Sequence, residues 1–159
     1  MDKVSPCLWY DGDAEEAANF YVSLLPGSRI DRIVRSPADN PSTKEGAVLV
    51  VDFTLAGRGF SGLNGGSQFK FTEAVSMSVA CDDQAEVDRL WAALSEGSPS
   101  IGPCGWIKDR WGLSWQIVPK AMLEMLGSED RDGARRAMQA MMQMSKLDLP
   151  TLRKAFEGG

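Results

Sequence analysis

Residues 104–119 of the chain, CGWIKDRWGLSWQIVP, decide how the rest of the sequence is interpreted. Two apolar runs, 104–108 and 113–118, flank the turn residues 109–112, which is the pattern of a β-hairpin. One amide, Gln116, lies inside the second apolar run. A polar side chain in such a place has either a structural partner or a ligand. The stretch therefore predicts two strands and one candidate binding residue.

Upstream of this stretch, a short aromatic strand at residues 4–10 precedes an amphipathic helix. Asp13 and Glu16 have the spacing of a capping box, so we expect Asp13 to accept hydrogen bonds from the first free N–H groups of the helix. The β-rich runs that follow are residues 28–35, 47–55 and 60–64. The predicted order is strand, helix, strand, strand, strand.

The pattern restarts after Gly65-Gly66. A strand at 73–81 leads to Asp83 and Glu86, which repeat the capping-box spacing, and an apolar stripe at helical spacing follows. The caps at Asp13 and Asp83 lie 70 positions apart. A recurrence of this length indicates a duplicated supersecondary unit, and the second copy shows one strand less clearly.

The charge and the residues that the chain lacks exclude several classes of protein. The net charge is -5 without a long basic run, which argues against binding to nucleic acid or to an anionic membrane. The chain contains no histidine, which removes imidazole bases, His-based triads and His metal ligands. No window has the length and apolarity of a membrane-spanning helix, and the N-terminal residues do not have the pattern of a signal peptide.

The cysteines Cys7, Cys81 and Cys104 are odd in number and have no CxxC spacing, which predicts reduced thiols and a cytoplasmic protein. Cys104 is the most plausible nucleophile, but no imidazole is present to lower its pKa. After Pro119 the composition changes, and helices are expected at 121–126, at 128–145 and after the capping residue Asp148. A methionine stripe at Met138, Met141 and Met142 indicates either core packing or a surface for a partner or ligand.

Three segments resemble one known family. They are PCLWYDGDAEEAANFYVSLLPGSRI (6–30), LNGGSQFKFTEAVSMSV (63–79) and CGWIKDRWGLSWQIVP (104–119). They look like the PhnB-like branch of the vicinal oxygen chelate superfamily, which includes glyoxalases, bleomycin-resistance proteins and extradiol dioxygenases. This branch is often labelled the 3-demethylubiquinone-9 3-methyltransferase domain family.

The resemblance implies an α+β fold in which two βαβββ modules form a curved mixed sheet around a pocket. The modules would be residues 1–66 and 73–119, within a paired region 1–119, and residues 120–159 would be a helical C-terminal extension of the same domain. The resemblance also implies a homodimer.

In metal-using members of the superfamily, a histidine lies on the first strand of each module and a glutamate on the last strand. If both histidine positions are counted seven residues before the helix caps, they fall on Pro6 and Ser76. The glutamate positions fall near Asn64 and on Gln116. None of these residues is a strong ligand for a transition metal, so we expect no metal site.

The same register predicts a pocket. Because side chains alternate along a strand, Leu8 and Tyr10 should share the pocket face, while Cys7, Trp9, Met77 and Val79 should lie under the helices. The complete predicted ligand-binding set is Leu8, Tyr10, Asn64, Ser76, Ser78, Trp106, Ser114 and Gln116. A pocket with these neutral polar groups suits a small organic or aromatic ligand.

Three functions remain open at this point. The first is a metal-free small-molecule-binding protein, or an enzyme of unknown substrate, and no catalytic residue is assigned. The second is the 3-demethylubiquinone-9 3-methyltransferase of the family label, which would use S-adenosylmethionine. The turns at 11–13 and 81–83 carry acids where a glycine-rich cradle for S-adenosylmethionine is needed. No cofactor is therefore predicted, and S-adenosylmethionine is expected only if the label is right. The third is a dimeric interaction module whose cavity is filled by its own side chains.

Overall fold

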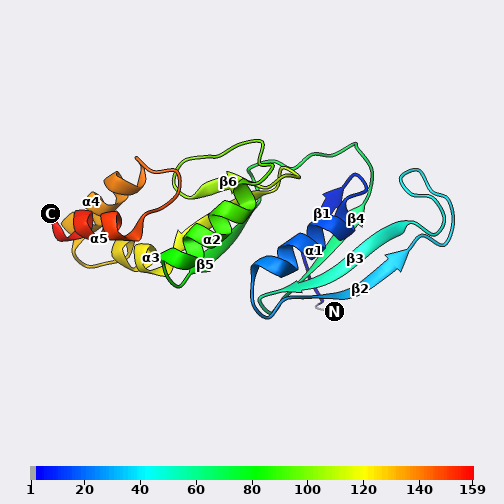
Figure 1. Ribbon diagram of the computed structural model, residues 1–159, viewed down its shortest axis with the longest axis horizontal. Helices are drawn as coiled ribbons and strands as arrows, with labels where there is room; N and C mark the ends of the chain where they lie inside the picture. Colours follow the sequence, from blue (N-terminus) through cyan, green and yellow to red (C-terminus); the bar gives the residue numbers. More distant parts are fainter. Residues whose placement is uncertain (1–2) are drawn as a thin grey trace. The chain divides into compact units, whose positions relative to one another are not determined.

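The computed structural model describes residues 3–159 and divides into two compact units, Met1–Lys70 and Phe71–Gly159 (Figure 1). Each unit contains its own mixed sheet and a helix that follows the first strand of that sheet. The predicted α+β class, with helices at the C-terminal end, is confirmed.

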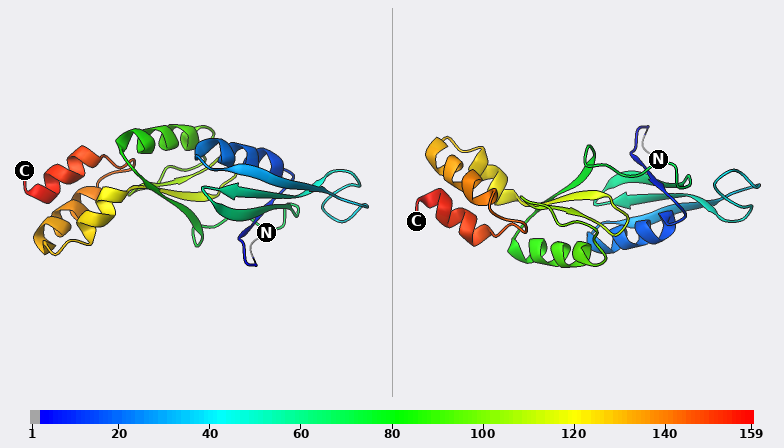
Figure 2. Two further views of the ribbon diagram at one scale, coloured as in Figure 1. Left: turned by 90° about the horizontal axis from the view of Figure 1, so that it is seen from below. Right: turned by 90° about the horizontal axis from the view of Figure 1, so that it is seen from above.

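The first unit has the order strand, helix, strand, strand, strand that the sequence predicts. Its elements are β1 (Cys7–Tyr10), α1 (Ala14–Leu24), β2 (Arg29–Arg35), β3 (Val48–Leu55) and β4 (Arg58–Asn64). The sheet order is β1-β4-β3-β2, with β1 parallel to β4 and the other pairs antiparallel. The loop between β2 and β3 extends beyond the ends of these strands (Figure 2).

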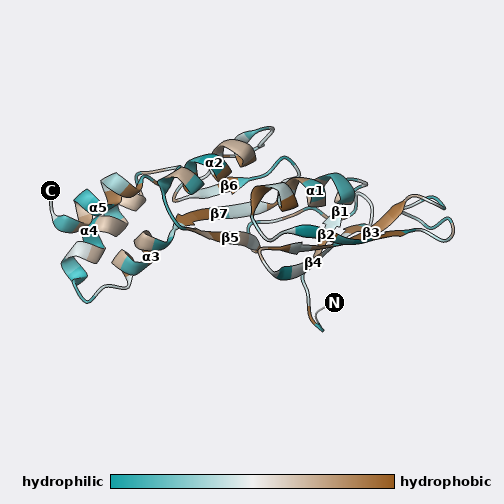
Figure 3. Ribbon diagram, turned by 60° about the horizontal axis from the view of Figure 1, so that its bottom comes forward, coloured by the Kyte–Doolittle hydropathy of each residue, from teal (hydrophilic) through white to brown (hydrophobic). Residues whose placement is uncertain are grey.

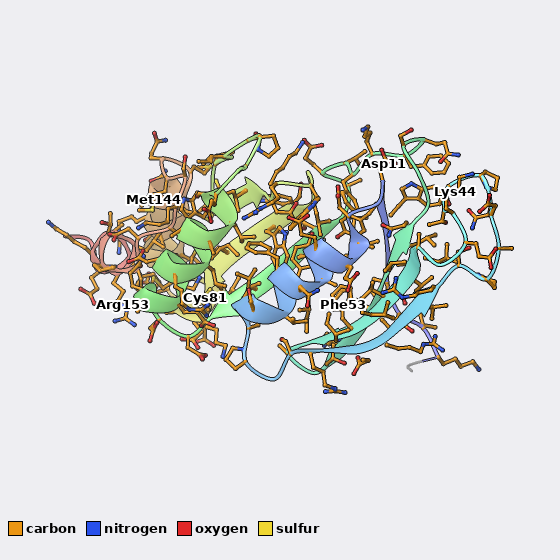
Figure 4. All side chains as sticks on the ribbon, turned by 45° about the vertical axis from the view of Figure 1, so that its right-hand side comes forward. Asp11, Lys44, Phe53, Cys81, Met144 and Arg153 are labelled. Atoms are coloured by element: carbon orange, nitrogen blue, oxygen red, sulfur yellow. The ribbon has the colours of Figure 1, made fainter. Side chains whose placement is uncertain are left out.

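The helix α1 covers one face of this sheet. Its apolar stripe, which includes Ala14 and Tyr21, is buried. The Tyr21 hydroxyl lies 2.9 Å from that of Tyr10 on β1, and its ring lies 6.2 Å from that of Phe53 on β3, which Figure 4 labels. A Cβ atom at Gly62 would lie 3.3 Å from the Cβ of Ala14, so the helix approaches β4 closely. This packing makes one face of the sheet the core of the unit.

The N-terminus of α1 is capped by Asn64 and not by Asp13, so the predicted cap is wrong. The Asp13 side chain makes no capping hydrogen bond. Asn64, at the end of β4, accepts from the Ala14 N–H through its Oδ1 atom at 2.9 Å and donates to the carbonyl of Val48 through its Nδ2 atom at 2.9 Å. A side chain 50 residues away along the chain therefore supplies the acceptor that a local aspartate was expected to supply.

The second unit has a smaller sheet. Its elements are β5 (Ser76–Cys81), α2 (Gln84–Ser95), β6 (Trp106–Lys108) and β7 (Ser114–Pro119), in the sheet order β5-β7-β6. The strand that the sequence shows less clearly is reduced to one bridge between Ile101 and Ile107. Prolines at 99 and 103 and a glycine at 102 surround Ile101, and these residues do not favour a longer ladder.

The predicted capping box of the second helix is confirmed. Asp83 accepts from the Glu86 N–H at 2.8 Å, and Glu86 accepts from the Asp82 N–H at 2.7 Å. The helix α2 covers the face of the sheet that carries Trp115, Ile117 and Cys81, which are at most 1% exposed.

The β6–β7 turn is built around a buried carboxylate. Asp109 is fully buried and accepts from the Trp111 N–H, the Leu113 N–H and the Trp115 indole N–H, at 2.9 to 3.0 Å. A charge in this position is stable because each bond brings a donor to it. The hairpin therefore depends on a buried Asp109, although an aspartate in a turn is usually exposed to solvent.

The C-terminal helices pack on the second unit and on one another. They are α3 (Lys120–Leu126), α4 (Arg131–Met141) and α5 (Leu149–Glu157), so the helix expected at 128–145 is shorter at both ends. Apolar residues on these helices form a core with Val118 of β7 and Leu147, and Figure 3 shows the mixed hydropathy of the helices. Met141 packs against this core, whereas Met138 and Met142 are exposed. No helix within residues 3–159 is long and apolar enough to span a membrane.

The Asn64 cap predicts a specific effect on stability. Asn64→Ala removes the acceptor for Ala14 and the donor for Val48, and we expect it to lower the free energy of unfolding by about 1–3 kcal/mol. Asp13→Ala removes only an exposed charge near the helix N-terminus, and its cost should stay below about 1 kcal/mol. Urea unfolding of both variants at 25 °C measures the difference. A larger loss in the Asp13 variant would contradict this assignment of the cap.

Candidate functional site

The face of the β5-β7-β6 sheet opposite α2 brings together most of the predicted binding residues. The strand register places Ser78, Gln116 and Trp106 in one row across the three strands. Ser76 and Ser114 lie in the next row with Lys108. Paired residues on neighbouring strands point to the same side of a sheet, so these side chains share the face that α2 does not cover.

Gln116 is held in place on this face by a direct bond. Its Nε2 atom donates to the Ser76 hydroxyl at 2.9 Å, and within residues 3–159 its Oε1 atom makes no hydrogen bond. The side-chain amide is therefore oriented and has an acceptor available. Ser76 serves as the partner of this amide and has no basic group beside it, so a nucleophilic role for it has no support.

A cavity of about 410 Å³ borders Trp106, Lys108 and Ser114 on this face, and Gln116 is not among its lining residues. Its lining residues are Glu73, Ser100, Gly102, Pro103, Trp106, Ile107, Lys108 and Ser114. A Cβ atom at Gly102 would lie 3.1 Å from the Cβ of Trp106, so a small residue is needed for the loop to pass close to the tryptophan. The Lys108 ammonium group lies 2.6 Å from Glu73 and, through a hydrogen bond, lowers the pKa of that exposed carboxyl. The remaining lining is apolar or neutral.

The first unit places the predicted residues on the opposite face. Leu8 and Tyr10 are 5% and 4% exposed, and they lie on the side of the sheet that α1 covers. Cys7 and Trp9, which were expected under the helix, lie on the open side. Asn64 is also buried, and both ends of its amide are used in the structural bonds described above. Leu8, Tyr10 and Asn64 therefore belong to the core.

A difference of one residue in a turn explains this inversion. Two residues, Asp11 and Gly12, separate β1 from Asp13, whereas only Asp82 separates β5 from Asp83. Gly12 has a φ of 98°, a conformation that glycine adopts readily. A count of seven residues back from each cap therefore places the first unit out of register by one position. A shift of one residue moves every side chain of a strand to the other face.

The open face of the first sheet carries residues that the sequence analysis did not identify. Asp52 of β3 bonds to Arg32 and Ser61, and a cavity of about 500 Å³ lies over these residues. The available signal was Asp52 itself, a charged residue within the apolar run VLVVDFTL. It is the same kind of signal as Gln116 within SWQIVP.

The residues at the superfamily's metal positions do not fit a metal ion. Asn64 uses its amide to cap α1, and Gln116 bonds to Ser76. Pro6 has no side-chain donor atom. Among residues 3–159, no three His, Cys, Asp or Glu side chains are grouped as a metal-binding cluster. Neutral amides and hydroxyls that bond to one another give a transition metal no charged ligand.

The surroundings of Cys7, which is exposed, and of Cys81, which is buried, raise the pKa values of both thiols. Burial raises the pKa of the Cys7 thiol, and the nearby Asp52 carboxylate raises it further. Burial, followed by the Glu86 carboxylate, raises the pKa of Cys81 to about 12. Cys104 has a φ of 57° and donates its N–H to the Met144 carbonyl, which ties the loop before β6 to the C-terminal helices. No arrangement of a thiol with an activating base is seen in residues 3–159.

Residues 2–118 match the family model described as 3-demethylubiquinone-9 3-methyltransferase. The PhnB protein of Bacillus cereus, which carries the same description, is 34% identical over 74% of this chain and 99% of that one, with a TM-score of 0.67. The chain belongs to this family. The predicted family is thereby confirmed. No curated protein matches the chain.

More distant structures show the fold alone. A protein of Pseudomonas aeruginosa is 21% identical over 72% of this chain and 95% of that one, with a TM-score of 0.57. A glyoxylase/bleomycin resistance protein/dioxygenase domain of Frankia is 16% identical over 72% of this chain and 94% of that one, with a TM-score of 0.45. This similarity is too low to support an argument about the fold. The family match ends at residue 118, so α3, α4 and α5 lie outside it.

The raised pKa values predict slow alkylation by iodoacetamide. Only the thiolate reacts, so the rate at folded Cys7 should reach half its maximum at a higher pH than that of an ordinary cysteine, which is half ionised at pH 9.0. At pH 8, Cys81 should have about a thousandfold less thiolate than an unperturbed cysteine, whose thiol has a pKa of 9.0. Peptide mass spectrometry across pH 7–10 measures both rates, and the same series in urea is the control. A pH profile of folded Cys7 that coincides with its profile in urea, or lies at lower pH, would refute this interpretation.

Proposed function

We propose that this protein binds a small organic molecule without a metal ion, on the open face of the β5-β7-β6 sheet. The observation that carries the proposal is the row of Ser78, Gln116 and Trp106, in which a Gln116 amide fixed by Ser76 keeps its oxygen available. The adjoining cavity of about 410 Å³ is within the size range of small-molecule sites.

The chemistry of this face favours an uncharged aromatic ligand that carries a hydrogen-bond donor. The one ion pair at its edge, between Lys108 and Glu73, is neutral overall. The Gln116 oxygen can accept a hydrogen bond from a hydroxyl group, and the half-buried Trp106 ring offers an aromatic surface for stacking. Within residues 3–159, these groups make no catalytic pair, so the proposal is limited to binding.

Methyl transfer from S-adenosylmethionine has less support in the residues. The turn before α1 is Asp11-Gly12-Asp13 and the turn before α2 is Asp82-Asp83, so neither provides a glycine-rich cradle. One N–H group in the first turn of each helix already bonds to a side chain, that of Ala14 to Asn64 and that of Glu86 to Asp83. These residues do not fit the cofactor, and we propose that the protein works without it. The homodimer and the cytoplasmic location stay predictions.

A phenol provides a direct test of the binding face. We expect 2-naphthol to bind with one site per chain and to quench tryptophan fluorescence. Gln116→Leu should weaken this binding by about 2–10-fold, because it removes one hydrogen bond. Trp106→Ala should weaken it further by removing the aromatic surface. Isothermal titration and fluorescence quenching give the dissociation constants.

The control is Gln139→Leu, which makes the same change at an exposed position of α4. It should leave the affinity unchanged. Equal affinities in the Gln116 and Gln139 variants, both with native melting temperatures, would refute the proposed binding face.

The cofactor proposal has a separate test. Titration of the protein with S-adenosylmethionine should give no saturable heat up to about 1 mM. A dissociation constant above about 1 mM corresponds to less than about 4 kcal/mol of binding free energy. S-adenosylhomocysteine, the product form, is titrated in parallel. A stoichiometric binding isotherm for either compound would establish the methyltransferase alternative in place of our proposal.

A further inference from the structure

The open face of the β1-β4-β3-β2 sheet is divided into a polar row and an apolar row that run side by side. The strand register aligns Arg32, Asp52, Ser61 and Cys7 across the four strands. Two positions further along each strand, it aligns Val34, Val50, Leu63 and Trp9. Positions two residues apart on a strand are separated by about 7 Å. A charged surface and an apolar surface therefore meet within the length of a small molecule.

The polar row is organised by Asp52, which is 8% exposed. Its Oδ2 atom accepts from the Nε and Nη2 atoms of Arg32 at 3.0 and 2.7 Å, and its Oδ1 atom accepts from the Ser61 hydroxyl at 2.7 Å. The carboxylate is thus occupied on both oxygens. The guanidinium group of Arg32 is fixed along one edge, and its side chain is 58% exposed.

A second pair repeats this arrangement beyond the irregularity in β2. Arg29 lies opposite Thr54, and its Nε atom is 2.7 Å from Asp31. The other oxygen of Asp31 accepts from the Thr54 hydroxyl at 2.6 Å. Both acids are occupied by donors of the protein, and both guanidinium groups border the same cavity of about 500 Å³. The two ion pairs are neutral overall, but the side chains of Arg29 and Arg32 are 67% and 58% exposed, whereas those of Asp31 and Asp52 are 33% and 11% exposed. The groups most accessible to a ligand are therefore the N–H donors of the arginines.

The apolar row ends in a tryptophan that is held rigidly. The indole N–H of Trp9 donates to the Gly66 carbonyl at 2.7 Å, and the ring lies so close to Gly65 that a Cβ atom there would be 2.3 Å from it. The Phe69 ring meets it edge-on at 4.9 Å. Val34, Val50, Leu63 and Trp9 are half-buried and form a continuous apolar strip across the sheet.

We propose that this face binds an amphipathic organic acid, with its carboxylate on Arg29 and Arg32 and its apolar body on the strip that ends at Trp9. Arginine suits this role because its planar fork can bond to a second carboxylate along the edge that the first leaves free. A cationic ligand is disfavoured, since Asp31 and Asp52 are already paired with Arg29 and Arg32 and are less exposed than these arginines. The inference does not depend on the proposed function, because the two faces belong to different units.

The test compares two ligands that differ only in charge. We expect 4-phenylbutanoate to bind and to shift the indole N–H resonance of Trp9 in a ¹⁵N–¹H correlation spectrum, with Trp9→Phe used to assign that resonance. The uncharged 4-phenylbutan-1-ol should bind at least about tenfold more weakly, because it cannot form charge-assisted hydrogen bonds. Raising the salt concentration from 50 to 500 mM should weaken the binding of 4-phenylbutanoate and leave that of the alcohol unchanged, since salt screens exposed charges.

Variants decide which residues carry the effect. Arg29→Gln and Arg32→Lys should each weaken binding of the acid about fivefold or more, and leave the weak binding of the alcohol unchanged. Two control variants should leave the affinity for 4-phenylbutanoate unchanged. One is Arg153→Gln, which removes the same charge from α5, and the other is Gln116→Leu in the second unit. Because Arg32→Lys leaves Asp52 with a poorer partner, a native correlation spectrum is required of it. If that variant unfolds, Arg29→Gln decides.

Two results would overturn the inference. One is equal affinity for the acid and the alcohol. The other is unchanged affinity for the acid in folded Arg29→Gln. Weaker binding of 2-naphthol by Gln116→Leu, together with retained binding of 4-phenylbutanoate, would support both surfaces. Unchanged binding of 2-naphthol in Gln116→Leu would count against the β5-β7-β6 face alone. Unchanged binding of 4-phenylbutanoate in Arg29→Gln would count against the β1-β4-β3-β2 face alone.

Discussion

Each described sheet is covered by one helix on one face, and because side chains alternate along a strand, this packing decides which of them are buried. Once α1 packs on Tyr10, Phe53 and Gly62, the residues between them along the strands must point to the other side. The same holds where α2 packs on the face that carries Trp115 and Ile117. Burial of apolar side chains under the helices contributes about 1.5–3 kcal/mol for each large residue, which fixes the register against a slip. The open faces are a consequence of this packing.

Polar groups then give each open face its chemical character. In the second unit, the Gln116 amide donates to the Ser76 hydroxyl and keeps its oxygen as an acceptor. In the first unit, carboxylates are occupied by arginines and hydroxyls, and N–H donors remain. The open faces of the two units therefore differ in their hydrogen-bonding groups. Within residues 3–159, neither face groups three His, Cys, Asp or Glu side chains as ligands for a metal ion.

The C-terminal helices are attached to the second unit by polar contacts as well as by their apolar core. Gln84, at the start of α2, bonds through both ends of its amide to the backbone of Leu147 and Leu149. The N–H groups of Cys104 and Gly105 donate to Met144 and Ser145. Gly105 is required there, because a Cβ atom would lie 2.8 Å from the Ile117 carbonyl. The extension is therefore an integral part of that unit, although it lies beyond the family match.

The sequence by itself determined the family, the order of strands and helices, and the caps at Asp83 and Asp148. These features depend on local spacing and on alternation within a strand, which a sequence displays directly. Only the tertiary structure decided that Asn64 caps α1, that Asp109 is buried, and that Leu8 and Tyr10 lie under the helix. Each of these depends on a partner brought close by folding, or on one extra residue in a turn, Gly12, whose effect on register appears only when the strands are paired.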